Sequence, residues 1–259
     1  MDDDHALAAL RAVTAAMVAT VRSTDHAAAV PACPGWTVTD LVDHLGRVHL
    51  WAAHCAREGA PPAPYPRRDR EQPLADWYAG CAGAIVTTLT ELPPEHPSWS
   101  FSADPAHGTA SFWRRRQLHE TVVHHVDALQ AAGRLARSGV VGEVPGLTAH
   151  DAADGVAEVF EVMAPRTLVR HAERPPLEVI PAPDPIAFSC NDVDAAWTVR
   201  LVDGAVELVD GVAPEAAARI SGPAAHLYLA LWHRADADRL SASGDEAAAR
   251  RLLGASLVP

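Results

Sequence analysis

Lysine is absent from the 259-residue sequence, so its 21 Lys and Arg positions are all arginine. The sequence has no basic block, and its formal net charge is -12, which argues against the positive surface that nucleic acids and anionic membranes attract. It also lacks an apolar run approaching the roughly 20 residues that cross a bilayer. The N-terminus, MDDDHALAAL, carries acidic residues where a secretory signal carries basic ones. We therefore expect a soluble, cytoplasmic protein that binds neither nucleic acid nor membrane.

Closely spaced cysteines are also missing. Cys33, Cys55, Cys81 and Cys190 form no CxxC pair, so the sequence favours neither a disulfide framework nor a thiolate zinc site. We expect them to be reduced thiols in the core. The chain shows no internal repeat at a fixed period, which argues against a solenoid.

The length exceeds the usual size of a single domain, which favours one domain plus a smaller second one. The first part of the chain, to about residue 135, contains four stretches with helical apolar spacing and no convincing strand pattern. The second helix has a clear start, because Pro34-Gly35 makes a turn and Thr37 can cap the backbone with Asp40. The sequence therefore predicts a four-helix bundle over residues 1–138.

A linker is predicted between residues 133 and 146, where Gly, Ser and Pro replace the helical pattern. After it, residues 149–163 have helical spacing, and Asp203-Gly204 predicts a hairpin. The predicted strands are 177–180, 186–190, 197–201, 206–209 and 216–221, followed by a helix over 223–233 and a short helix after Gly244. This pattern predicts a smaller α+β domain over residues 147–259.

A histidine of the second helix points toward the core. If that helix runs from residue 38 to about 57, His44 lies on the same stripe as Leu41 and Trp51. A single inward histidine is more often a hydrogen-bonded core residue than a metal ligand. His44 alone therefore leaves both interpretations open.

The fourth helix contains LHETVVHHVD, residues 118–127, which superficially resembles the zinc motif HExxH. That motif needs histidines four residues apart, whereas His119 and His124 are five apart and diverge by about 140°. The pair that shares a face is Glu120 and His124, with Asp127 three residues further along the same stripe. These side chains form either part of a metal site or the solvated face of a helix whose opposite side is apolar.

If both helices turn these groups toward a common point, His44, Glu120 and His124 form the open ligand set typical of catalytic zinc. Another divalent transition metal can bind the same donors. Asp127 could then accept the second ring N–H of a ligating histidine. The alternative for Asp127 is a surface carboxylate near an arginine.

Three segments resemble one protein family. VPACPGWTVTDLVDHLGRVHLWA, residues 30–52, resembles the second-helix signature of mycothiol-dependent maleylpyruvate isomerases and related DinB-like proteins. RRRQLHETVVHHVDA, residues 114–128, resembles the family's fourth-helix signature, and ISGPAAHLYLALWHRADADRL, residues 220–240, resembles its C-terminal domain. The resemblance covers nearly the whole chain and implies a DinB-like, metal-binding four-helix bundle followed by a smaller α+β sterol-carrier-like domain.

Carried over to this sequence, the resemblance implies that His44, Glu120 and His124 bind zinc. The zinc would bind the sulfur of mycothiol, the low-molecular-weight thiol of actinobacteria, as a cosubstrate. The implied activity is addition of a metal-bound thiolate to a small electrophile, which an isomerase then releases and an S-transferase keeps. The lysine-free, Ala- and Arg-rich composition agrees with an actinobacterial source.

The resemblance also implies a cleft in which an arginine of the second domain binds a substrate carboxylate. Arg219 and Arg234 are the candidates there, and Arg47 of the second helix is a further one. Trp36 and Trp51 could line the same mouth. The alternatives are solvated arginines and tryptophans that pack in the core.

Three functions stay open from the sequence. The first is a mycothiol-dependent isomerase or S-transferase that acts on a small electrophile. The second is a non-catalytic module that binds a metal or an apolar ligand, and the third is a hydrolase that uses metal-activated water. The oligomeric state is undetermined, with a monomer slightly favoured.

Overall fold

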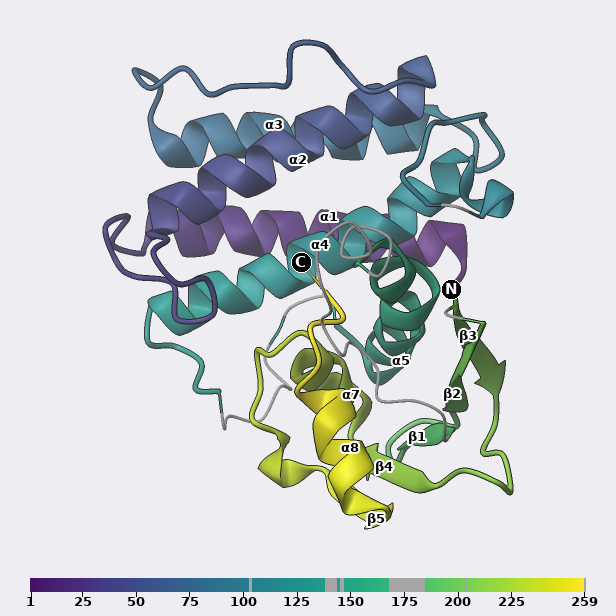
Figure 1. Ribbon diagram of the computed structural model, residues 1–259. Helices are drawn as coiled ribbons and strands as arrows, with labels where there is room; N and C mark the ends of the chain where they lie inside the picture. Colours follow the sequence, from purple (N-terminus) through teal and green to yellow (C-terminus); the bar gives the residue numbers. More distant parts are fainter. Residues whose placement is uncertain (103, 138–143, 145–146, 168–184, 204, 259) are drawn as a thin grey trace. The chain divides into compact units, whose positions relative to one another are not determined.

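The computed structural model describes residues 1–102, 104–137, 144, 147–167, 185–203 and 205–258. These residues form two compact units (Figure 1), one built on Met1–Ala136 and the other on the chain from Leu147 onward. The predicted architecture, a helical bundle followed by a smaller unit with a mixed sheet, is confirmed.

Four long helices make up the first unit. They are α1 (Asp3–Arg22), α2 (Val38–Glu58), α3 (Leu74–Glu91) and α4 (Ala110–Ala131), with a short 3-10 helix, η1 (Pro105–His107), before α4. Helix α1 packs against α3 and α4, and α2 packs against the same two helices. The four helices therefore enclose one apolar core, in which Leu41, Leu45 and Tyr78 are fully buried.

Local contacts define how α2 begins and how closely it packs. As predicted, Thr37 and Asp40 form a capping box, in which the Asp40 carboxylate accepts the Thr37 backbone N–H at 2.9 Å. Gly46 lies directly under the Trp77 ring of α3, and a Cβ atom at this position would come within 2.4 Å of the ring. The absence of a side chain at Gly46 thus permits the close contact between α2 and α3.

The first helix also has a length and composition that the sequence analysis overlooked. Within the described residues, α1 alone is long and apolar enough to span a bilayer, and half of that stretch is buried inside the fold. Leu10, Val13 and Met17 of α1 are completely buried. Core helices of soluble proteins pass the same test, and this burial explains why α1 is apolar.

The second unit combines helices with a five-stranded sheet. Its elements are α5 (Ala149–Glu158), the π-helical η2 (Val159–Met163), β1 (Ile186–Cys190), β2 (Ala196–Val202), β3 (Ala205–Asp210), β4 (Ala218–Gly222), α7 (Ala224–Leu231), η3 (Ala237–Arg239), β5 (Ser241–Gly244) and α8 (Glu246–Leu253). The strand order is β3-β2-β1-β4-β5. Strands β1 and β4 are parallel, and all other neighbours are antiparallel.

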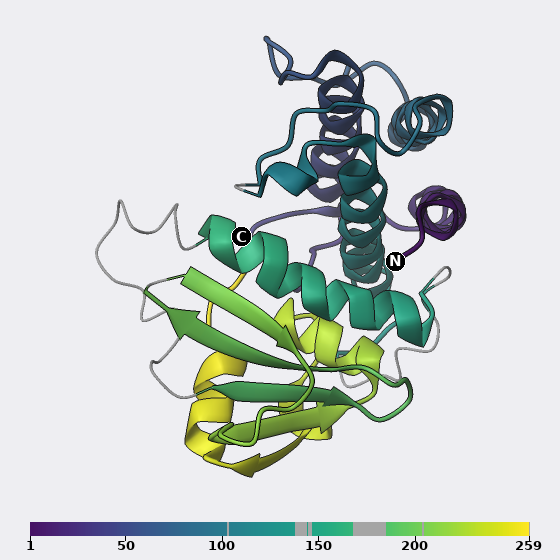
Figure 2. The ribbon, with the colours of Figure 1, turned by 90° about the vertical axis from the view of Figure 1, so that its right-hand side faces the viewer.

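Large apolar side chains of the second unit's core gather on one face of the sheet. Ile186, Phe188 and Ile220 share this face and are buried, and the Phe160 ring of η2 lies 5.2 Å from the Phe188 ring. Helices α5 and α7 pack on each other beside the sheet (Figure 2). Along β4, buried Ala218 and Ile220 alternate with exposed Arg219, so this strand is covered on the face that carries Ile220.

Four of the predicted strands correspond to β1, β2, β3 and β4, and the predicted helices near residues 149, 223 and 244 are confirmed. Asp203 has a φ of 50° between β2 and β3, in keeping with the predicted hairpin. The edge strand β5 was missed, because its SASG sequence is polar and exposed and lacks the residues that favour strands. The predicted strand 177–180, Gly204 and most of the predicted linker lie outside the described residues.

Candidate metal centre

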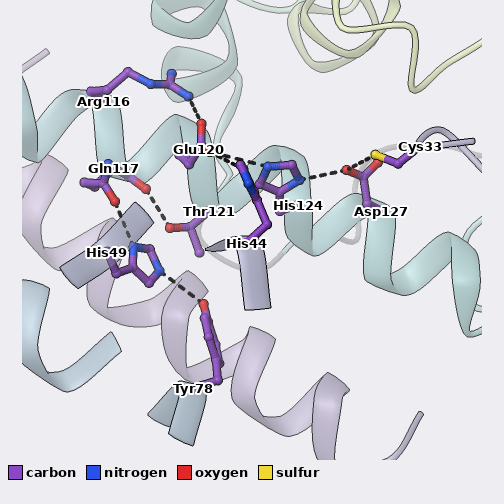
Figure 3. A network of polar contacts seen from close by, with 10 residues as sticks. All are labelled: Cys33, His44, His49, Tyr78, Arg116, Gln117, Glu120, Thr121, His124 and Asp127. Atoms are coloured by element: carbon purple, nitrogen blue, oxygen red, sulfur yellow. Dashed lines mark hydrogen bonds and ion pairs between the residues drawn. The ribbon is translucent and has the colours of Figure 1, made fainter. Parts of the chain in front are cut away.

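Three side chains from α2 and α4 converge on one point (Figure 3). His44 Nε2 lies 3.5 Å from Glu120 Oε1, and His124 Nε2 lies 3.4 Å from the same oxygen. One potential ligand atom from each residue lies within 4.8 Å of those of the other two. Within the described part of the chain, this is the one group of histidine, cysteine or acidic side chains that is compact enough to hold a metal ion. The structure thus brings together the three residues that the sequence analysis singled out.

The spacing of these atoms fits a metal centre. Zinc binds nitrogen and oxygen at about 2.0–2.2 Å, so the ligands of a tetrahedral site lie roughly 3.3–3.5 Å apart. The two distances to Glu120 Oε1 are of that size. Two imidazoles and one carboxylate are also a donor set that zinc accepts while one coordination position stays open. The geometry and the chemistry of the donors are therefore both suitable.

The other oxygen of Glu120 pairs with a buried arginine of the same helix. Glu120 Oε2 accepts a hydrogen bond from Arg116 Nη2, one turn earlier on α4. Burial by itself raises the pKa of Glu120, but the Arg116 charge and hydrogen bonds from His124 and His44 outweigh it and hold this pKa well below its usual range. Glu120 is therefore a carboxylate near neutral pH, with one oxygen directed at the histidines.

Asp127 determines how the ring of His124 is oriented. His124 Nδ1 donates to Asp127 Oδ2 at 2.9 Å, and the Asp127 side chain is fully buried. Burial lowers the pKa of His124, but the contacts with Asp127 and Glu120 outweigh it and raise this pKa to about 9. The alternative that Glu120, His124 and Asp127 form a solvated face is wrong, because the side chains of α4 that surround them are almost all buried. The alternative of a surface carboxylate at Asp127 is wrong for the same reason.

His44 is the most accessible member of the group. Its side chain is 39% exposed, compared with 14% for Glu120 and 10% for His124. It is therefore less buried than the apolar stripe of α2 predicts, although its Nε2 does face α4. A small molecule would reach the three ligand atoms from the His44 side.

The two tryptophans have different surroundings. The Trp36 ring lies 5.2 Å from the His44 ring, measured between centroids. Trp51 instead packs edge-to-face against Trp99 and Trp113, with centroids 5.6 and 5.3 Å away. Trp36 thus contacts the candidate centre directly, whereas the ring of Trp51 packs against other aromatic side chains.

The three candidate arginines also differ. Arg47 Nε donates to the Pro66 carbonyl at 3.0 Å, and its guanidinium lies over the Tyr65 ring. Arg219 is exposed on β4. Arg234 is buried, and its Nη1 donates to the Trp232 carbonyl at 2.7 Å.

A buried polar network beside the centre was missed in the sequence analysis. His49 Nδ1 lies 2.7 Å from Gln117 Oε1 and His49 Nε2 lies 3.3 Å from Tyr78 Oη (Figure 3). Burial lowers the pKa of His49 to about 4, so the ring is neutral near neutral pH. The position of His49 on the stripe of Leu41, Leu45 and Ala52 could have indicated its burial, whereas its partners depend on how the helices pack. The Arg116 pairing also has a signal in the sequence, namely the four-residue spacing to Glu120.

The four cysteines are all reduced, as expected. Cys55 and Cys81 are buried, but Cys33 and Cys190 are only partly so. The expectation of four core thiols is therefore wrong for two of them. Cys33 Sγ lies 3.8 Å from Asp127 Oδ2, close to the candidate centre.

Comparisons with known proteins agree with this organisation. Residues 7–129 match the mycothiol maleylpyruvate isomerase N-terminal domain, and residues 150–251 match the C-terminal domain of the same family. A crystal structure of the mycothiol-dependent maleylpyruvate isomerase superposes with a TM-score of 0.59 at 16% identity, covering 94% of this chain and 93% of that one. A histidine-to-alanine mutant of a mycothiol-dependent maleylpyruvate isomerase gives 0.58 at 14% identity with the same coverage. A search of curated proteins finds no match.

Proposed function

Because the chain belongs to the mycothiol maleylpyruvate isomerase family, a family of enzymes, we propose that it is a metal-dependent enzyme that uses mycothiol as cosubstrate. His44, Glu120 and His124 would hold a divalent transition metal, zinc in the first instance. The substrate would be a small electrophile, either maleylpyruvate or a related compound. We further propose a cytoplasmic location in an actinobacterium, where this thiol occurs.

The convergence of the three side chains is the observation that carries the proposal. Their donor atoms come from two helices, and the distances to Glu120 Oε1 suit a single ion. A fully protein-bound structural zinc site would need a fourth ligand. The set of three, open on the His44 side, instead supports a site that receives a small molecule.

A divalent metal in this position would act as a Lewis acid and lower the pKa of a thiol bound beside it, so that the nucleophilic thiolate exists near neutral pH. Glu120 contributes one negative charge and one oxygen, since Arg116 occupies the other. Asp127 accepts the Nδ1 proton of His124, which leaves Nε2 as the metal-binding atom. Trp36 borders the accessible side of His44, where the thiol and the electrophile would enter.

An isomerase and an S-transferase share the first step, in which the thiolate adds to an activated double bond of the electrophile. In an isomerase the bond rotates and the thiolate leaves again, whereas in a transferase the carbon–sulfur bond is kept. The family name supports the isomerase, and we adopt it as the first activity to test.

An arginine side chain would bind a carboxylate of the substrate. Arg219 is an exposed residue of β4, and Arg47 lies one turn after His44 on α2. Arg234 is a weaker candidate, because it already donates to a backbone carbonyl in a buried position. An arginine that binds the substrate carboxylate should, on replacement by alanine, raise KM for a carboxylate substrate and leave metal content unchanged. Trp51 would line the mouth of the site, and its replacement by leucine tests that role in the same assay.

The test combines metal analysis with a dependence on thiol. Purified protein is analysed for bound metals, stripped with a chelator, reloaded with zinc and assayed with maleylpyruvate and other electrophiles, with and without mycothiol. We expect about one metal ion per chain and turnover only when both zinc and mycothiol are present. The His44→Ala variant should lose metal and turnover together, whereas His54→Ala, an exposed residue on the same helix, should keep both.

Each of the rival functions predicts a different result. Turnover without any thiol would indicate a hydrolase that uses metal-activated water. Metal uptake without turnover of any electrophile would indicate a binding module. Failure of the protein to take up a transition metal would contradict the proposed centre itself.

A further inference from the structure

A short loop ahead of α2 lies against the candidate centre. Within this loop, Val30 donates its backbone N–H to the Trp36 carbonyl at 2.9 Å, and Trp36 donates to the Cys33 carbonyl at 3.0 Å. Gly35 has a φ of +84°, which glycine adopts without strain. These hydrogen bonds and the turn at Gly35 fix the backbone of the loop that carries Cys33, just before the helix that carries His44.

Two side chains of this loop contact the surroundings of the two histidines. Trp36 packs against His44, and Cys33 Sγ lies 3.8 Å from Asp127 Oδ2. This is the same carboxylate oxygen that accepts the proton of His124 Nδ1 at 2.9 Å (Figure 3). Cys33, Asp127 and His124 therefore form a chain of contacts that ends at a candidate metal ligand.

In the contacts that join Cys33, Asp127 and His124, Asp127 is the acceptor and its two neighbours are the donors. A buried carboxylate can only accept hydrogen bonds, and the thiol of Cys33 is a weak donor. The S–H group can therefore donate to Asp127 Oδ2 without displacing the hydrogen bond that His124 Nδ1 donates to the same oxygen. A stronger or charged donor at this position would withdraw more negative charge from the carboxylate that orients the imidazole.

Cys33 is not a metal ligand in this arrangement. The cluster able to hold an ion, within the described residues, consists of His44, Glu120 and His124. The sulfur instead contacts the residue behind His124, on the side of the ring opposite to Nε2. Its effect on a metal would be transmitted through Asp127.

We propose that Cys33 is a positioning residue of the metal centre, whose thiol holds Asp127 in the orientation that directs His124 Nε2 at the ion. This inference rests on the proposed metal site, but not on the identity of the electrophile or on turnover. Residues that hold a ligand from behind typically change metal affinity by about 10–100-fold when they are removed. Since a thiol is a weak donor, we expect an effect near the lower end of that range for Cys33.

The experiment measures zinc affinity by competition with a chromogenic chelator, and the visible spectrum of the cobalt-substituted protein. Cys33→Ala should bind zinc roughly tenfold more weakly than the parent and shift the cobalt bands. The matched control is Cys55→Ala, which removes a buried thiol within α2 and should leave both readouts unchanged. Thermal unfolding of the metal-free variants monitors their folding.

A double-mutant cycle tests the route through Asp127. In an Asp127→Asn background, Cys33→Ala should have little further effect on zinc affinity, because the carboxylate through which it acts is gone. If the parent protein binds zinc and Cys33→Ala has the same zinc affinity and cobalt spectrum, the proposed role of Cys33 is wrong. An equally large effect in the Asp127→Asn background would overturn it as well. If the parent protein binds no metal, both the centre and the role of Cys33 are wrong.

Discussion

Arg116 and Glu120 lie one turn apart on α4 and form an ion pair that leaves a single oxygen of the carboxylate facing His44 and His124. Both members of the pair are largely shielded from solvent, with Arg116 only 3% exposed. The arrangement balances the charge of a carboxylate inside the bundle before any cation is bound.

This pair predicts that the effect of losing Arg116 depends on metal. Removing one partner of a buried ion pair typically destabilises a protein by about 3–5 kcal/mol, because the remaining charge is uncompensated. Metal-free Arg116→Gln should lose stability of that order. The zinc-loaded variant should lose much less, since the bound cation then compensates Glu120. Urea denaturation with and without zinc measures the difference.

Arg57→Gln is the control for this prediction. Arg57 pairs with Glu91 at the surface, where both side chains are about half exposed, and such pairs contribute about 0–1 kcal/mol. Its loss should be small and independent of zinc. An equal destabilisation of Arg116→Gln in both metal states would contradict the assignment of Glu120 as a ligand.

The buried His49 predicts a loss of stability in mild acid. Its pKa is lowered to about 4 by burial, from 6.5 when it is unfolded, so the unfolded chain binds more protons between these values. Stability is therefore complete above about pH 6.5 and falls as the pH drops toward 4, by roughly 3 kcal/mol from this residue. Chemical denaturation at a series of pH values between 7 and 4.5 measures the slope.

His49→Gln isolates this contribution, because glutamine is polar but does not titrate. The variant is expected to be less stable at pH 7 and to lose less stability between pH 7 and 4.5 than the parent. His125 also has its pKa lowered to about 4 by burial, so some dependence on pH should persist. An identical slope in the parent and the variant would show that His49 is not responsible.

Gly46 predicts that a single methyl group weakens the bundle. In Gly46→Ala the new Cβ would lie 2.4 Å from the Trp77 ring, so the ring or the helix has to move. Overpacking of this kind typically destabilises by about 1–3 kcal/mol, which should exceed the gain of about 0.5–1 kcal/mol from replacing a helical glycine by alanine. Thermal unfolding measures the net effect.

The matched substitution is Gly83→Ala in α3. Gly83 is exposed, and no atom lies within 4 Å of a Cβ built there, so only the gain in helix propensity applies. Gly83→Ala should unfold at a slightly higher temperature than the parent, and Gly46→Ala at a lower one. Equal stabilisation of both variants would show that the contact between Gly46 and Trp77 has room for a methyl group.

The sequence predicts the helices of the bundle well because their signals are local. Thr37 and Asp40 mark the beginning of α2 in the sequence and form the same capping box in the structure. The sequence also indicates the three candidate ligands, because Glu120 and His124 are four residues apart on one helix and the inward stripe of α2 includes His44. Their convergence needed the resemblance to a family or the structure itself, since it depends on the packing of α2 against α4.

Interactions between side chains distant in sequence could not be predicted in this way. Cys33 and Asp127 belong to a loop and a helix on either side of α2 and α3, and no spacing rule connects them. His49 and Tyr78 likewise meet only because α2 and α3 pack together. The edge strand β5 escaped prediction for a different reason, since it pairs with β4 through its backbone while its side chains are small and polar.

His44 and Glu120 are separated in sequence by all of α3 and the loops on either side of it. An ion that binds both residues closes this long segment into a ring, much as a disulfide cross-link would. Loss of the metal would then do more than abolish the proposed activity. It would also remove this cross-link between α2 and α4, so the metal-free bundle should open more often and be cleaved faster by proteases than the metal-loaded one.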